Sequence, residues 1–131
     1  MNRRDFMLLT GATVTLPSVT WAKAMAYTPG LVKEKLAAGE TVLIDYTATW
    51  CSTCRAQGRT LTKLKEANSA YEENITFIDI DWDQFGRGDL AQELKIPRRS
   101  TLVLLRGDQE LGRIVADTRE SNIKALLDRA L

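Results

Sequence analysis

Two cysteines set three positions apart are the residues of this sequence best suited to chemistry. Cys51 and Cys54 lie in the stretch "TWCSTCR", and they are the only cysteines among the 131 residues. A pair at this spacing can form a structural clip, contribute two ligands to a metal site, or exchange electrons with other thiols and disulfides. The rest of the sequence decides between these three kinds of chemistry.

The composition argues against both the structural clip and zinc. A disulfide that closes so short a loop removes little entropy from the unfolded chain, and a chain of 131 residues buries a core without one. A structural zinc site needs four ligands and a catalytic zinc site needs at least three from the protein. Two cysteines and no histidine do not supply these from soft ligands. Electron exchange is therefore the favoured chemistry, and we predict no resident metal.

The predicted elements around the pair favour a reactive thiolate. The unbroken apolar run from Val42 to Ile44 predicts a strand over residues 41–48 that is buried on both faces. A helix follows this strand, so Cys51 falls at the helix N-terminus, where unpaired N–H groups and the helix dipole stabilise a thiolate. Cys54 falls one turn further along, within reach of Cys51.

The segment "VLIDYTATWCSTCR" resembles the active-site segment of the thioredoxin family, and the resemblance extends over residues 29–131. It implies that Cys51 is the nucleophile and Cys54 the resolving thiol, and that the two form a redox-active disulfide. It also implies that Trp50 is a wall of the site. Asp45 would be the buried carboxylate that helps to move the proton of Cys54.

Two of the departures from the pattern of the family bear directly on the chemistry of the site. Asp79 lies where a lysine often tunes the buried carboxylate, and Ser100 falls where the family has a cis-proline opposite the cysteines. Pro97 would restore the proline only with three extra residues before the next strand, so we take Ser100 as the counterpart. A cis bond before a residue other than proline costs about 2.5–4 kcal/mol, so the Arg99–Ser100 bond is expected to be trans. We expect serine to open the site.

Two cations in the same loop are predicted to face the pair. Arg98 and Arg99 directly precede Ser100. Positive charge near Cys51 would lower the pKa of its thiol and would attract acidic partners. We therefore place Trp50, Arg98, Arg99 and Ser100 in the predicted binding surface.

The regular elements follow one order along the chain: helix, strand, helix, strand, helix, two strands and a helix. We expect helices over residues 28–40, from the cysteines to Tyr71, and over 89–95. We expect strands over 41–48 and 75–81, and a hairpin over 100–117 that turns at Gly107 and Asp108. A C-terminal helix follows a capping box of Asp117 and Glu120. This order predicts an α/β domain with a mixed central sheet flanked by helices, ending in a β-hairpin and a C-terminal helix. The resemblance implies that this arrangement is the thioredoxin fold.

Residues 1–26 have the layout of an export signal. They contain paired arginines at positions 3 and 4, a modestly apolar middle that is too polar and short for a membrane span, and small residues spaced A-x-A at the end. The arginine pair resembles the twin-arginine type, which carries folded proteins across a membrane. We predict cleavage after Ala24 or Ala26, a mature domain over residues 27–131 with no stable membrane anchor, and a location in the bacterial periplasm. The alternative is a basic tail on a cytosolic protein.

The charge of the chain does not indicate a nucleic-acid partner. The formal net charge is +1, but three of the 18 basic and one of the 17 acidic side chains lie in the first 24 residues. The remaining chain carries 15 basic and 16 acidic side chains. A domain so close to neutral lacks the positive surface that binding to phosphates requires.

These observations predict a periplasmic thiol:disulfide oxidoreductase that reduces disulfide bonds in other proteins. The resemblance implies reduction, because the sequence has no large helical insertion and carries Asp45 at the buried proton-acceptor position. We expect no cofactor besides the redox-active disulfide of Cys51 and Cys54. The expected partners are protein disulfide substrates and a membrane thiol-reductase that donates electrons.

A binding function is the alternative to an enzyme. Two soft thiolates suit Cu(I) or, across a dimer, an iron–sulfur cluster, and export in the folded state suits a protein that first acquires a cofactor. A third interpretation is an interaction domain of the same fold with an inert cysteine pair.

Overall fold

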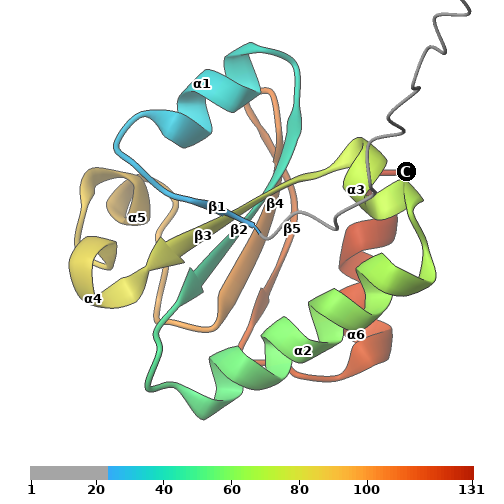
Figure 1. Ribbon diagram of the computed structural model, residues 1–131. Coiled ribbons are helices and arrows are strands. Elements are labelled where there is room, and N and C mark those ends of the chain that lie inside the picture. The colour runs from blue at the N-terminus through green and yellow to red at the C-terminus, as the bar shows by residue number, and fades with distance from the viewer. Residues whose placement is uncertain (1–23) are drawn as a thin grey trace, which may run out of the picture.

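A five-stranded sheet runs through the middle of the protein (Figure 1). The computed structural model describes residues 24–131. The strands are β1 (Met25–Ala26), β2 (Thr41–Thr47), β3 (Thr76–Asp81), β4 (Thr101–Arg106) and β5 (Gln109–Val115), in the spatial order β1-β3-β2-β4-β5. The strands β1, β3 and β2 are parallel, whereas β4 is antiparallel to both β2 and β5. The predicted mixed sheet with a closing hairpin is confirmed.

The central strand β2 explains the apolar run in the sequence. It pairs with β3 on one side and β4 on the other, and its first six residues are buried. Val42 and Ile44 pack into the core on one face of the sheet, and Leu43 packs into the core on the other. Because side chains alternate along a strand, Asp45 shares the face of Leu43.

Helices cover both faces of the sheet (Figure 1). One face carries α2 (Ser52–Ala67), α3 (Ala70–Asn74) and α6 (Glu120–Asp128), and the other carries α1 (Leu31–Ala37), α4 (Trp82–Phe85) and α5 (Asp89–Glu93). Each helix turns an apolar stripe toward the sheet. Among residues 24–131, no helix has both the length and the apolar character needed to cross a membrane.

The helix that follows the cysteines is shorter than predicted. It ends at Ala67, and Tyr71 lies on the separate helix α3. Asn68 interrupts the helix because its backbone is extended, and its side chain accepts a hydrogen bond from the N–H of Ala70 at 3.0 Å. Such a local bond lets asparagine replace a helical turn. Tyr71 still reaches the core that α2 covers.

The predicted capping box before the last helix is wrong. Arg119 is the N-cap of α6 and has no capping side chain. Asp117 instead accepts hydrogen bonds from the N–H of Arg119 at 2.9 Å and from the Asn122 amide at 2.6 Å. An aspartate that bonds its own backbone two residues on forms a turn, so Asp117 shapes the approach to α6.

The strand β1 lies in the segment that the sequence assigns to the export signal. Met25 and Ala26 pair with Ile78 and Asp79 at the edge of the sheet. Cleavage after Ala24 would keep this strand, and cleavage after Ala26 would remove it. The arginine pair and the apolar middle of the predicted signal lie outside the described residues.

Leu127 provides a test of the core between α6 and the sheet. Its side chain is fully buried, whereas Leu131 is 56% exposed. We expect Leu127→Ala to lower the free energy of unfolding by about 2–5 kcal/mol, because it removes buried methyl groups and leaves a cavity. Urea unfolding followed by circular dichroism measures this. Leu131→Ala is the matched control, and an equal loss in both variants would contradict the assigned core.

Candidate active site

The first turn of α2 presents both sulfur atoms at one end of β2. Cys51 is the N-cap of α2, with an extended backbone, and its Sγ accepts a hydrogen bond from the N–H of Cys54 at 3.2 Å. The bond from the N–H of Cys51 to the carbonyl of Ala48, at 3.1 Å, fixes the preceding turn. Both cysteines are free thiols and are buried. The predicted placement of Cys51 at the helix N-terminus is confirmed.

Ser100 lies opposite the cysteines, at the position expected for the family's cis-proline. Its Oγ is 3.2 Å from Sγ of Cys51 and 3.0 Å from Sγ of Cys54. No peptide bond within residues 24–131 is cis, so the bond before Ser100 is trans as expected. The expectation that serine would open the site is wrong, since Ser100 is fully buried and its hydroxyl occupies the space between the sulfurs.

When Cys51 is ionised, its sulfur can only accept, so the hydroxyl of Ser100 must be the donor in the hydrogen bond between them. A hydroxyl has one proton to donate and two lone pairs to accept with. Its proton therefore goes to the Cys51 thiolate, and the single proton of the Cys54 thiol can be donated either to the Ser100 oxygen or to the Cys51 sulfur. This chain of bonds favours negative charge on Cys51 and a proton on Cys54.

The environment of Cys51 lowers the pKa of its thiol. Burial raises this pKa, but hydrogen bonds from the Cys54 thiol, the Ser100 hydroxyl, the Cys54 N–H and the Arg99 side chain bring it down to about 6. The charge of Asp45 also interacts with this sulfur. The thiolate, which is the attacking species in disulfide exchange, is thus the main form at neutral pH.

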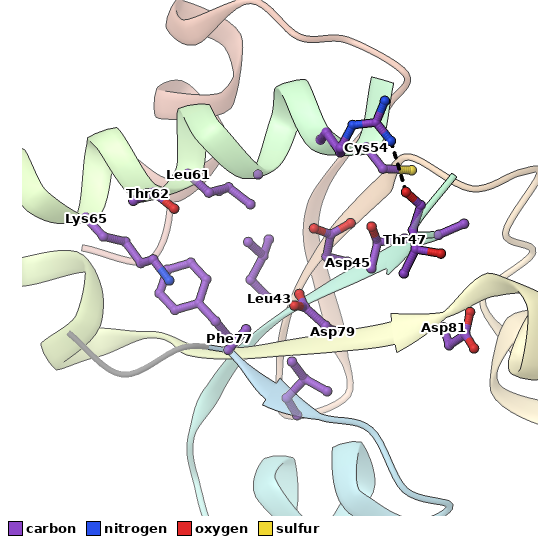
Figure 2. A pocket seen from close by; sticks show the side chains of 16 residues that line it. Leu43, Asp45, Thr47, Cys54, Leu61, Thr62, Lys65, Phe77, Asp79 and Asp81 are labelled. Atoms are coloured by element: carbon purple, nitrogen blue, oxygen red, sulfur yellow. Dashed lines mark hydrogen bonds between the residues drawn. The ribbon is translucent and has the colours of Figure 1, made fainter. Parts of the chain in front are cut away.

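Asp45 lies behind the cysteines in a cavity of about 640 Å³ that Cys54 also lines (Figure 2). Asp79 stands beside it on the neighbouring strand, in register, and Lys65 reaches into the same space from α2 (Figure 2). The amine of Lys65 lies 4.4 Å from the centre of the Phe77 ring. In the part of the chain that the structure describes, Oδ1 of Asp45 is buried without a hydrogen-bond partner.

Burial keeps Asp45 protonated at neutral pH. Desolvation is the largest cause, and together with the nearby charges of Asp79 and Cys51 it raises the pKa of Asp45 to about 8. Burial also raises the pKa of Asp79, while the charge of Lys65 opposes that effect. A carboxyl group with this pKa can take up and release a proton near neutral pH.

The rim of the site contains Trp50, which is 54% exposed. Its indole N–H donates to Asp83 at 2.8 Å, and the guanidinium of Arg99 lies 4.5 Å from the ring centre. Arg98 does not take the predicted place beside the sulfurs. Its Nε donates to the carbonyl of Arg99 at 3.0 Å, and it is not among the groups that shift the pKa of Cys51.

Sequence reasoning missed two residues of the site. Asp83, which holds Trp50, belongs to the short helix α4 that no pattern predicted. Gln57 is fully buried and donates hydrogen bonds to the carbonyls of Ser100 and Asp117, each at 3.0 Å. A signal for Gln57 was present, because a polar residue there interrupts the apolar stripe that Leu61 continues.

The soft ligands at this site are the two cysteine sulfurs. No group of three or more His, Cys, Asp or Glu side chains within residues 24–131 is arranged to hold a metal ion. Any Cu(I) or cluster would therefore have to be held by Cys51 and Cys54, which are both already within hydrogen-bond distance of Ser100.

An α/β domain with one thiolate at a helix N-terminus, a second thiol a turn later and a buried carboxyl behind them defines a class of dithiol exchange proteins. Comparison with known families agrees with this class. The family model described as Thioredoxin matches residues 24–129. The chain belongs to the thioredoxin family.

Individual relatives agree with this assignment. The chain is 35% identical over 81 residues to the mitochondrial thioredoxin-2 of Schizosaccharomyces pombe, covering 62% of this chain and 56% of that protein. It is 32% identical over 89 residues to a thioredoxin of Aspergillus fumigatus, covering 68% and 77%. It thus spans little more than half of the first relative.

A solved structure extends the likeness to three dimensions. The crystal structure of Trxlp from Edwardsiella tarda superposes with a TM-score of 0.67 at 29% identity, covering 82% of this chain and 98% of that one. The fold predicted from the order of strands and helices is therefore that of a solved relative.

The raised pKa of Asp45 predicts a pH-dependent stability. Folding favours the protonated form, so this contribution is fully present below pH 3.8 and is lost as the pH rises through about 8. We expect Asp45→Asn to gain stability relative to the parent as the pH rises from 3.8 to about 8 and to keep that difference above pH 8, on the order of a few kcal/mol. Urea unfolding of the reduced proteins from pH 4 to pH 9 measures it.

Asp108→Asn, in the exposed turn between β4 and β5, controls for the change in net charge. A stability difference between Asp45→Asn and the parent that stays constant from pH 4 to pH 9 would contradict the buried, protonated Asp45.

Proposed function

We propose that this protein is a thiol:disulfide oxidoreductase that reduces disulfide bonds in other proteins. The observation that carries the proposal is the arrangement of the two cysteines. The Cys54 thiol lies one turn after Cys51, and both sulfurs are within hydrogen-bond distance of the Ser100 hydroxyl. Hydrogen bonds to Cys51 lower the pKa of its thiol to about 6. A thiolate with a pKa somewhat below the ambient pH combines a high ionised fraction with good nucleophilicity.

The proposed reaction proceeds in two exchanges. The Cys51 thiolate attacks one sulfur of the substrate disulfide, the substrate S–S bond breaks, and one substrate thiolate leaves. Cys54 then loses its proton and attacks the Cys51 sulfur of this mixed disulfide. The second substrate thiol is released, and a Cys51–Cys54 disulfide remains. Two electrons have passed from the cysteine pair to the substrate, and an external dithiol must return them.

Asp45 is the proposed acceptor of the proton that Cys54 loses. It shares a cavity with Cys54, and the charge of Cys51 is one of the causes that raise its pKa. That charge disappears when Cys51 enters the mixed disulfide. The pKa of Asp45 then falls, so a larger fraction is the carboxylate at the moment when Cys54 must be deprotonated.

The proposed direction is reduction. Within residues 24–131, only the short helices α4 and α5 separate β3 from β4, so the domain has no large helical insertion there. The buried acid at Asp45 also matches the resemblance to reducing members of the family. The rim of Trp50 and Arg99 supplies an exposed aromatic face with a cation above it, which suits acidic polypeptide substrates.

The proposed location is the bacterial periplasm. This proposal rests on the export-signal layout of residues 1–26. Cleavage after Ala24 is preferred, because it would keep β1 in the sheet. A reductant in this compartment needs electrons from across the membrane, so the proposed donor is a membrane thiol-reductase.

We propose that the chemistry needs no cofactor besides the cysteine pair. The alternative, in which the two thiolates hold Cu(I) or, across a dimer, an iron–sulfur cluster, uses the same two cysteines as ligands. Metal content measured on protein purified without added metal separates the two.

The activity can be tested by the reduction of insulin with dithiothreitol as electron source. We expect the protein to accelerate the reaction and Cys51→Ser to return it to the rate of dithiothreitol alone. Cys54→Ser should accumulate a mixed disulfide, because its resolving thiol is gone. Ser69→Ala, at an exposed serine away from the site, is the control.

The reduction potential of the Cys51–Cys54 pair, measured on the same preparation, tests whether the protein reduces or oxidises its substrates. A value near about −270 mV is expected for a reductant, and one near about −120 mV would contradict reduction. Stoichiometric metal in this sample would contradict the proposed absence of a cofactor.

Export can be tested by expressing the full chain in a bacterium with a twin-arginine pathway. We expect a periplasmic product that begins at Met25, and its loss when both Arg3 and Arg4 are changed to lysine. Lys23→Gln, which alters charge outside the arginine pair, should be exported normally. A full-length product that stays in the cytosol would refute the proposed location.

A further inference from the structure

Gln57 is a buried polar residue that the proposed exchange reaction does not use. It lies on α2 one turn after Cys54, on the stripe that also carries Leu61 and Leu64. Its side chain is fully buried. Its Nε2 donates to the carbonyls of Ser100 and Asp117, each at 3.0 Å, so one amide joins three segments of the chain.

The backbone of Ser100 needs such support. Its φ is 63°, in the left-handed region, which costs free energy for any residue with a Cβ atom. Its N–H donates to the carbonyl of Tyr46 at 2.7 Å, and its carbonyl accepts from the N–H of Ala116 at 2.9 Å. Gln57 adds the only side chain among these partners, and it comes from the helix that carries both cysteines.

Polarity at this position is costly unless it serves a purpose. Oε1 of Gln57 is buried and, within residues 24–131, has no hydrogen-bond partner. An unpaired buried carbonyl destabilises the folded state, whereas an apolar side chain would suit the stripe. The two donated hydrogen bonds therefore fix a backbone conformation that apolar packing alone would not fix. One of these bonds goes to Ser100, so the conformation of Ser100 is the one held in place.

We infer that Gln57 is a positioning residue for the dithiol chemistry: it holds the Ser100 hydroxyl between the two sulfurs and thereby favours the Cys51 thiolate. The inference deepens the proposed function and rests on it. Gln57 acts through Ser100, since its amide donates hydrogen bonds to backbone carbonyls and to neither sulfur. If these bonds are lost, Ser100 can leave the left-handed conformation and its hydroxyl moves away from the sulfurs.

Several groups besides Ser100 face Cys51. Cys54 approaches from α2, Arg99 from the loop before β4, and the charge of Asp45 acts from β2. A change at Gln57 leaves these groups in place chemically. A double-mutant cycle with Ser100 can therefore separate the route through the hydroxyl from every other route.

The measurement is the pH at which Cys51 of the reduced protein is alkylated by iodoacetamide at half its maximal rate, with the site read by mass spectrometry. We expect Gln57→Met, which keeps the length but removes both donors, to raise this midpoint by roughly 0.5 to 1 pH unit. Ser100→Ala should raise it by a similar amount. In the double variant Gln57→Met with Ser100→Ala, the midpoint should equal that of Ser100→Ala alone.

Leu64→Ala is the matched control for general damage to α2, because Leu64 is buried on the same stripe, has no bond to Ser100 and does not line the cavity of Asp45. We expect it to lower stability and leave the midpoint unchanged. Gln57→Glu is a second variant, which stays polar if Gln57→Met does not fold, and it should also raise the midpoint.

Three outcomes would overturn the inference: an unchanged midpoint in folded Gln57→Met or Gln57→Glu, an equal shift in Leu64→Ala, or a Gln57 effect that persists in full without the Ser100 hydroxyl. The alkylation midpoint is independent of turnover. A failure of insulin reduction with the expected midpoints would thus contradict the proposed function and leave the positioning role supported.

Discussion

The contact on which the site depends is the one between the Ser100 hydroxyl and the two sulfurs. It joins the first turn of α2 to the start of β4, two places 46 residues apart in sequence. The pairing of β2 with β4 makes this possible, because it brings Tyr46 beside Thr101 and lets the Tyr46 carbonyl accept from the N–H of Ser100. The pairing of the strands thus sets the distance between the Ser100 hydroxyl and the two sulfurs. The first turn of α2 favours the negative charge on Cys51, because the N–H of Cys54 donates to its sulfur.

Two titratable groups at this site shift in opposite directions, and burial acts on both. Burial raises the pKa of Asp45 and of Cys51, but Cys51 gains hydrogen bonds to its charged form, whereas Oδ1 of Asp45 has none from residues 24–131. The thiol is therefore charged and the carboxyl neutral at the same pH. A negative sulfur beside a protonated acid is a stable resting state, because two adjacent negative charges in a buried space would repel each other.

The central features of this site could be predicted from the sequence. The apolar run before the cysteines determines a buried strand, and that strand fixes Cys51 at a helix start and Asp45 behind it. Ser100 could be placed from the length of the segment before β4. Its left-handed backbone could not, because conformation there depends on bonds to Tyr46 and Gln57 that connect distant segments. The break at Asn68 and the short elements β1 and α4 were missed because two to four residues carry too little periodicity.

Trp82 lies where its side chain can report the state of the two cysteines. This side chain packs against the small cluster of Ala48, Cys51 and Cys54, and its ring lies edge-on to Tyr46 at a centroid distance of 6.0 Å. An indole packed against the cluster that contains both cysteines experiences ionisation and oxidation of the pair as a change in its surroundings. The protein therefore carries its own optical probe, and its intrinsic fluorescence can report the state of the cysteines without a label.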